Sequence, residues 1–114
     1  MADKPKTHRN LFNPNMIVFQ VDGVVYHEKW HGTIVHCVIV IEYSPTDKIY
    51  DFLDLTTWLD SLKDETFRMS EYCNLIYERI WDAIENGVLK VSVLNMTSYG
   101  EITIVKHTNH PTIS

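Results

Sequence analysis

The sequence predicts one α+β domain in which an antiparallel sheet carries two helices on one face. Extended, apolar runs occupy both ends of the chain, and two stretches with helical periodicity lie between them. The expected order is therefore β-β-α-α-β-β, with both helices inserted between two hairpins. A length of 114 residues with 45% hydrophobic residues suits a single core.

The first half contains the extended runs. Residues 16–21 and 24–26 are rich in strand-forming side chains, and Asp22-Gly23 between them predicts a bend. Residues 33–43 form the strongest run, because their alternate positions make an unbroken apolar face and the opposite face is partly apolar too. We expect this strand to be central, with a second subunit covering what the helices leave open.

The middle of the chain predicts the two helices. Leu55, Trp58, Leu59 and Leu62 repeat at helical spacing, and a longer periodic stretch runs from about Arg68 to Asn86. Gly87 follows at the position of a left-handed C-cap. Residues 89–94 and 101–106 then predict a second hairpin, with a loop at residues 97–100.

The two ends of the chain indicate the bounds of the domain, and the composition indicates its partners and location. We expect residues 1–15 to be a flexible arm, residues 16–107 the domain and residues 108–114 a tail. A formal charge of -5 argues against nucleic acid as a partner. No apolar stretch is long enough for a membrane span and no signal-peptide pattern occurs, so we expect a cytoplasmic protein with buried, unpaired Cys37 and Cys73.

Catalytic motifs are sparse. His27, His31 and His36 are close in sequence but lack a nearby cysteine or carboxylate at ligand spacing, so we favour structural or exposed histidines over a metal site. No GxSxG motif and no phosphate-binding loop occurs. Glu28 and Glu71 are the more informative carboxylates. Glu71 lies in a predicted first helical turn, where it either binds a ligand or simply stabilises the helix.

Three short motifs carry a resemblance to a known family. Gly23–Lys29 reads GVVYHEK, with Gly32 opening the long strand. Residues 47–55 (DKIYDFLDL) lead a tyrosine into the first helix, and Phe67–Glu71 reads FRMSE. In this order and spacing, from about Ile17 to Lys106, the chain resembles the tunnelling-fold enzymes of pterin and purine chemistry, above all dihydroneopterin aldolase and its epimerase relatives.

The resemblance implies a site. A glutamate at the Glu71 position anchors the amino-pyrimidine edge of a pterin, with Phe52 and Ser70 as further substrate-binding positions. Glu28 lies by the reacting end of the substrate, and the family's tyrosine aligns with Phe52 or, after a one-residue shift, with Tyr50. Such sites form between the subunits of ring-shaped, barrel-forming oligomers, here a homo-tetramer or homo-octamer. The resemblance implies neither a metal nor another cofactor.

Asn95 departs from the family pattern, since it replaces the catalytic lysine that ends the third strand. An amide cannot relay a proton in a retro-aldol reaction. The resemblance thus predicts a protein of the dihydroneopterin aldolase type that binds a pterin or purine-like ring, with catalysis in question. The alternative is a non-catalytic oligomeric module of structural or regulatory function. His31-Gly32-Thr33 is more distantly similar to the 6-pyruvoyl-tetrahydropterin synthase group, but Thr33 replaces a zinc-binding histidine of that motif.

Overall fold

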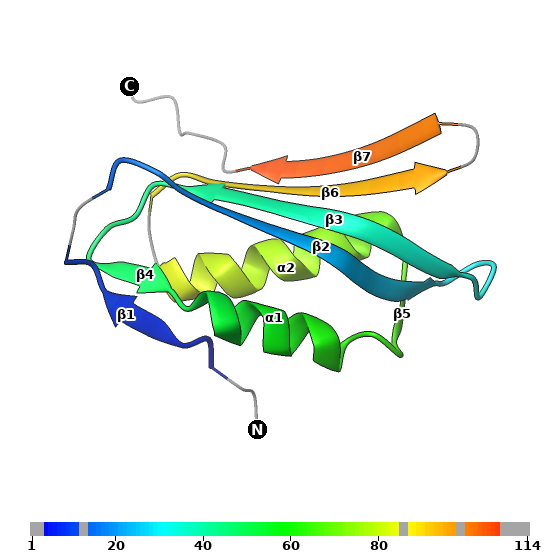
Figure 1. The fold of residues 1–114 in the computed structure, drawn as a ribbon, viewed down its shortest axis with the longest axis horizontal. Coiled ribbons are helices and arrows are strands. Elements are labelled where there is room, and N and C mark those ends of the chain that lie inside the picture. The colour runs from blue at the N-terminus through cyan, green and yellow to red at the C-terminus, as the bar shows by residue number, and fades with distance from the viewer. Residues whose placement is uncertain (1–3, 12–13, 85–86, 98–99, 108–114) are drawn as a thin grey trace.

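The computed structural model describes residues 4–11, 14–84, 87–97 and 100–107. A sheet forms one layer and two helices form the other (Figure 1). The long strands are β2 (Ile17–Glu28), β3 (Ile34–Tyr43), β6 (Leu89–Thr97) and β7 (Gly100–His107). The helices are α1 (Phe52–Ser61) and α2 (Met69–Ile84). These elements confirm the expected α+β architecture, with both helices between the two hairpins.

The sheet has the order β5-β2-β3-β6-β7. The prediction that β3 is central is confirmed, because it pairs antiparallel with β2 on one side and with β6 on the other. One detail of the prediction was wrong. The two-residue strand β5 (Thr66–Phe67) pairs parallel to the end of β2, so the sheet is mixed and not purely antiparallel.

Two further short strands lie apart from the main sheet. β1 (Thr7–Arg9) pairs antiparallel with β4 (Lys48–Tyr50), and the backbone N–H of Asp51 donates to the Lys6 carbonyl at 2.9 Å. β1 lies inside the segment expected to be an arm. Strands of two or three residues show no alternation that a sequence pattern could reveal, which explains why β1, β4 and β5 were not predicted. The expected tail at residues 108–114 lies outside the described residues.

The expected bend at Asp22-Gly23 is a β-bulge within one strand. The register of β2 against β3 shifts between Val21 and Val24, and Gly23 has a φ of +68°. A positive φ is easily adopted only by glycine, so Gly23 allows the extra residue to be accommodated without ending the strand.

The helix boundaries follow local capping chemistry. α1 begins before the apolar repeat, because the Asp51 carboxylate accepts a hydrogen bond from the Leu53 N–H at 2.9 Å and acts as N-cap. After α2, Gly87 has the expected positive φ, at +105°. A Cβ at this position would lie 2.8 Å from the Ser44 carbonyl oxygen, so glycine is also required for close approach of the two backbones.

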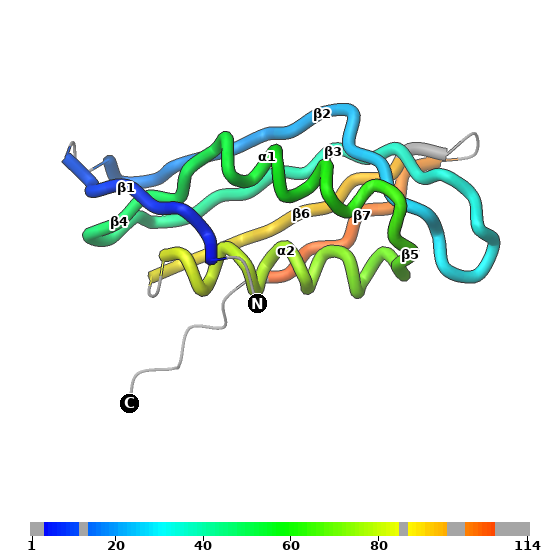
Figure 2. Tube along the Cα trace, turned by 90° about the horizontal axis from the view of Figure 1, so that it is seen from below, coloured from blue at the N-terminus to red at the C-terminus, as the bar shows by residue number. Residues whose placement is uncertain are grey.

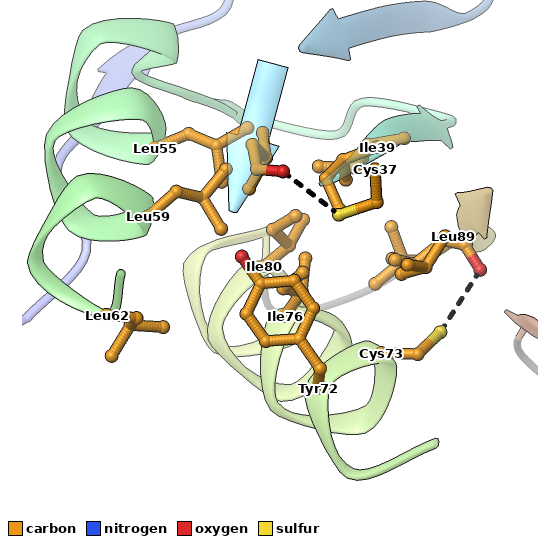
Figure 3. Close-up of a cluster of buried hydrophobic side chains, with 14 of the residues drawn as sticks. Cys37, Ile39, Leu55, Leu59, Leu62, Tyr72, Cys73, Ile76, Ile80 and Leu89 are labelled. Carbon is orange, nitrogen blue, oxygen red and sulfur yellow. Dashed lines mark hydrogen bonds between the residues drawn. The ribbon is translucent and has the colours of Figure 1, made fainter. Parts of the chain in front are cut away.

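The core lies between the sheet and the helices. α1 packs against β2, whereas α2 packs against β6 and β7 (Figure 2). Cys37 and Cys73 are buried free thiols, as expected, and donate to the carbonyls of Val24 and Val91 (Figure 3). Burial raises the pKa of the Cys37 thiol to about 11, which makes it a packing residue and not a nucleophile.

The opposite face of the sheet has no helix over it in the described part of the chain. Val38 and Val40 of β3 are half-buried there, and Val18 of β2 and Val105 of β7 are 56% and 45% exposed. Both outer edges of the sheet also have few partners: β2 pairs with β5 only at His27 and Glu28, and β7 has no described neighbour beyond β6. None of the described helices is long and apolar enough to cross a bilayer.

Candidate functional site

The candidate site lies where the β2–β3 turn meets the start of α2. Glu28, the last residue of β2, pairs with Phe67 of β5, and the next backbone N–H, that of Lys29, donates to the Phe67 carbonyl at 3.0 Å. Two segments far apart in the sequence are thereby joined at one end of the molecule (Figure 1).

Glu28 holds the turn in shape. Its Oε2 accepts hydrogen bonds from the backbone N–H groups of Trp30 at 2.9 Å and His31 at 2.7 Å. Its carbonyl accepts from the Gly32 N–H at 2.8 Å, and Gly32 has a φ of +66°. These contacts support a structural role for the Glu28 carboxylate, because it satisfies backbone donors of its own turn.

Glu71 lies in the first turn of α2 and has one oxygen directed to the backbone. Its Oε1 accepts from the Arg68 N–H at 2.9 Å, which is one half of a capping box. This hydrogen bond, together with the charge of Lys29, holds the pKa of Glu71 below its usual range. The side chain is 47% exposed, so an ionised carboxylate is available at the surface.

Lys29 brings a cation to the other oxygen. Its Nζ lies 3.9 Å from Glu71 Oε2, and the Lys29 side chain is 50% exposed. Both residues line a surface pocket of about 360 Å³, a volume within the range of small-molecule sites. The remaining lining residues are Thr66, Phe67, Asn74, Leu75 and Glu78.

An aromatic cluster supports this pocket from inside. The Phe67 ring, which lines the pocket, lies 5.2 Å from the Tyr72 ring, and Tyr72 stacks on Tyr26 at 4.3 Å. Tyr26 and Tyr72 are buried. On the surface, Trp30 is 69% exposed and the Arg68 guanidinium lies 4.9 Å from its ring. Phe67 therefore forms an apolar wall beside the Glu71 carboxylate, packed on the buried Tyr72 ring.

Tyr50 and Phe52 lie at the other end of the domain, near β4 (Figure 1). The Tyr50 hydroxyl donates to Asp54 at 2.6 Å and accepts from Arg79 at 3.0 Å. Burial raises the pKa of the Tyr50 hydroxyl above its usual range. Phe52 is 39% exposed and packs edge-on against Phe19. Within one chain, these two residues do not join Glu28 and Glu71.

Asn95 and Ser70 lie nearer to the site. Asn95 of β6 pairs with Cys37 and with Ile102, so its side chain projects from the helix-covered face of the sheet. Ser70 is exposed in the first turn of α2, directly before Glu71.

In the described residues, no three histidine, cysteine or carboxylate side chains gather as a potential metal site. His27 contacts the Lys63 carbonyl at 3.1 Å.

No sequence motif singled out Lys29, Trp30 or Arg68 as site residues. Their importance follows from the contact between the β2–β3 turn and α2, which no local pattern encodes. The charge of Lys29 directly after Glu28 was the one available signal.

No family model matches the chain, and no curated protein matches it. The chain is similar in structure to archaeosine synthase QueF-Like, as seen in its apo crystal structure, with a TM-score of 0.78 and 17% sequence identity. The match covers 86% of this chain and 98% of that one. The chain thus has a tunnelling fold, as expected. This neighbour supports the fold and not dihydroneopterin aldolase in particular.

Proposed function

We propose that the protein binds the amino-pyrimidine edge of a pterin or purine-like ring through Glu71. The observation that carries the proposal is an ionised, half-exposed carboxylate in a pocket of about 360 Å³ beside the Phe67 ring. Two neighbouring ring donors suit one carboxylate, because both of its oxygens can accept. Oε1 accepts one backbone hydrogen bond from Arg68 and retains capacity for a second.

The site of this proposal is shared between subunits of a homo-oligomer. The open edges of β2 and β7 and the apolar, helix-free face of the sheet support association. Phe52 lies at the end of the domain remote from Glu71, so it can reach the same ring only from a neighbouring copy. The Tyr50 hydroxyl is already engaged within its own chain.

Catalysis of the dihydroneopterin aldolase type is weak or absent in this proposal. Asn95 offers no titrating group, and the Glu28 carboxylate is occupied by two backbone donors. General acid–base assistance is typically worth about 10²–10⁴-fold in rate, so its loss would reduce turnover to a low level. These contacts favour a ring-binding module over an efficient lyase.

Fluorescence titration with pterin tests the binding proposal. Glu71→Gln should weaken binding at least about tenfold, because it removes the charge from a hydrogen-bonded pair. Glu78→Gln is the matched control, since Glu78 lies in the same pocket but about two turns further along α2. Equal affinities of the parent and Glu71→Gln, or no pterin or guanine binding by the parent, would refute the proposal.

The same preparations test turnover. The parent should cleave dihydroneopterin slowly or not at all, and Asn95→Lys should increase the rate if a titrating group at this position is what the site lacks. Product formation by the parent at an ordinary enzymatic rate, about 1–10³ s⁻¹, would contradict the binding-module interpretation without affecting the role of Glu71.

A further inference from the structure

The Lys29 side chain places a cation beside the Glu71 carboxylate in the pocket. Its Nζ lies 3.9 Å from Glu71 Oε2, beyond hydrogen-bond length, so the two groups form an ion pair without a direct hydrogen bond. The N–H groups of the Lys29 ammonium can therefore donate to a ligand acceptor that lies next to the carboxylate.

Lys29 is anchored at its backbone, although its side chain is half-exposed. Its N–H donates to the Phe67 carbonyl at 3.0 Å, and the Glu28 carboxylate holds the next two backbone N–H groups. The start of the Lys29 side chain is thus fixed relative to the Phe67 wall of the pocket. Such a backbone anchor reduces the entropy lost when the side chain binds a ligand.

A 2-amino-4-oxo pyrimidine edge presents an amino donor, a ring N–H donor and a carbonyl acceptor in a row. The two donors match the Glu71 carboxylate, and the carbonyl then lies beside it, on the side where a donor is needed. We infer that Lys29 donates to this carbonyl and so selects 2-amino-4-oxo rings against 2,4-diamino rings. This inference rests on the ring-binding function proposed for Glu71.

Rejection of the diamino ring follows from the same geometry. A 4-amino group would direct its own donors at the Lys29 ammonium, and neither group could accept. Two donors facing each other leave both unsatisfied, and discrimination built on polar groups of this kind is stronger than discrimination by size. If Lys29 were only an exposed ion-pair partner of Glu71, its loss would change the affinities for the two rings by the same factor.

Titrations with pterin and with 2,4-diaminopteridine test the inference on the full chain. The parent should bind pterin at least about tenfold more tightly than the diamino ring. Lys29→Met should weaken pterin binding about tenfold and leave the diamino ring unchanged or tighter, so that the preference narrows by at least about tenfold. The preference that remains comes from Glu71, because N3 of pterin carries a hydrogen and donates, whereas N3 of the neutral diamino ring is an acceptor. Lys29→Arg retains a cationic donor and should keep the preference. Lys63→Met, at an exposed lysine outside this pocket, is the matched control.

The outcomes separate the two proposals. If the parent binds both rings equally, or Lys29→Met retains the full parental preference for pterin, the role of Lys29 is refuted while the function of Glu71 stands. If Glu71→Gln binds both rings as tightly as the parent, or the parent binds neither, the ring-binding function fails and the inference fails with it.

Discussion

Arg79 of α2 and Asp54 of α1 form an ion pair inside the domain, with Arg79 Nη2 2.8 Å from Asp54 Oδ2. Both side chains are less than one-tenth exposed. The Tyr50 hydroxyl donates to the same carboxylate oxygen and accepts from Arg79 Nε, and the Arg79 guanidinium lies 4.8 Å from the Trp58 ring. This network joins both helices to β4.

Arg79→Met should strongly destabilise the protein. Removal of one partner leaves the Asp54 charge buried without its cation, which typically costs about 3–5 kcal/mol. Urea unfolding at fixed protein concentration measures this loss. Lys90→Met is the control, because Lys90 pairs with Glu42 at the surface and its loss should cost less than about 1 kcal/mol. Similar losses in the two variants would contradict the importance of the buried network.

Asp54 should also make stability depend on pH. Burial alone would raise the pKa of Asp54, but hydrogen bonds from Tyr50 and Arg79 and the Arg79 charge hold it below its ordinary value of 3.8. Because the folded form has the lower pKa, this stabilisation is fully present above pH 3.8 and is lost as the pH falls from 3.8 through the lower pKa of the folded form.

Unfolding free energies at pH 6 and pH 3 measure this dependence. The acid-induced loss of stability should be smaller in Asp54→Asn than in the parent, whereas Asp60→Asn, at an exposed carboxylate of the same helix, should retain the parental loss. An unchanged loss in Asp54→Asn would show that other carboxylates dominate.

Tyr72→Phe should stabilise the protein. The Tyr72 side chain is fully buried, and its hydroxyl has no hydrogen-bond partner among the described residues. An unsatisfied buried polar group costs about 1–3 kcal/mol, so removal of the hydroxyl should raise the free energy of unfolding by about 1 kcal/mol. Tyr43→Phe is the control and should destabilise, because the Tyr43 hydroxyl accepts from the Tyr50 N–H at 3.0 Å. Destabilisation by Tyr72→Phe would reveal a partner for that hydroxyl.

The protein should be a homo-oligomer in solution. Light scattering at micromolar concentration should give a mass several times the 13.3 kDa of one chain, since an exposed apolar face and two open sheet edges favour association. Val18→Lys, on the helix-free face, should reduce this mass without unfolding the chain. Thr57→Lys, at an exposed position of α1, serves as control. A monomeric parent would refute the intersubunit site.

Periodicity predicted the long elements well. The two-faced apolar run of β3 indicated a central strand, and α2 follows its apolar repeat closely. The strands of the second hairpin extend further than predicted, because Thr97 and Gly100, which were expected in the loop, pair with each other. The residues between them lie outside the described residues. The short strands β1, β4 and β5 escaped prediction because their pairing depends on distant segments and not on local alternation.

The candidate site was only partly predictable. The FRMSE motif indicated Glu71 at the start of a helix, and helix geometry accounts for its position. The contact of Lys29 with Glu71 and the pair of Arg79 with Asp54 each join residues from different elements. Such contacts arise from tertiary packing, so a single sequence carries no periodic signal for them.

The bulge at Gly23 has a consequence for self-association. It divides the open edge of β2 into two segments, residues 17–21 and 24–26, with a register shift between them. Fibril-forming stacks require about six or seven consecutive residues in one register, and neither segment provides them. A neighbouring strand with a matching irregularity can still pair along the whole edge. The bulge therefore allows ordered assembly while it protects the exposed edge against amyloid growth.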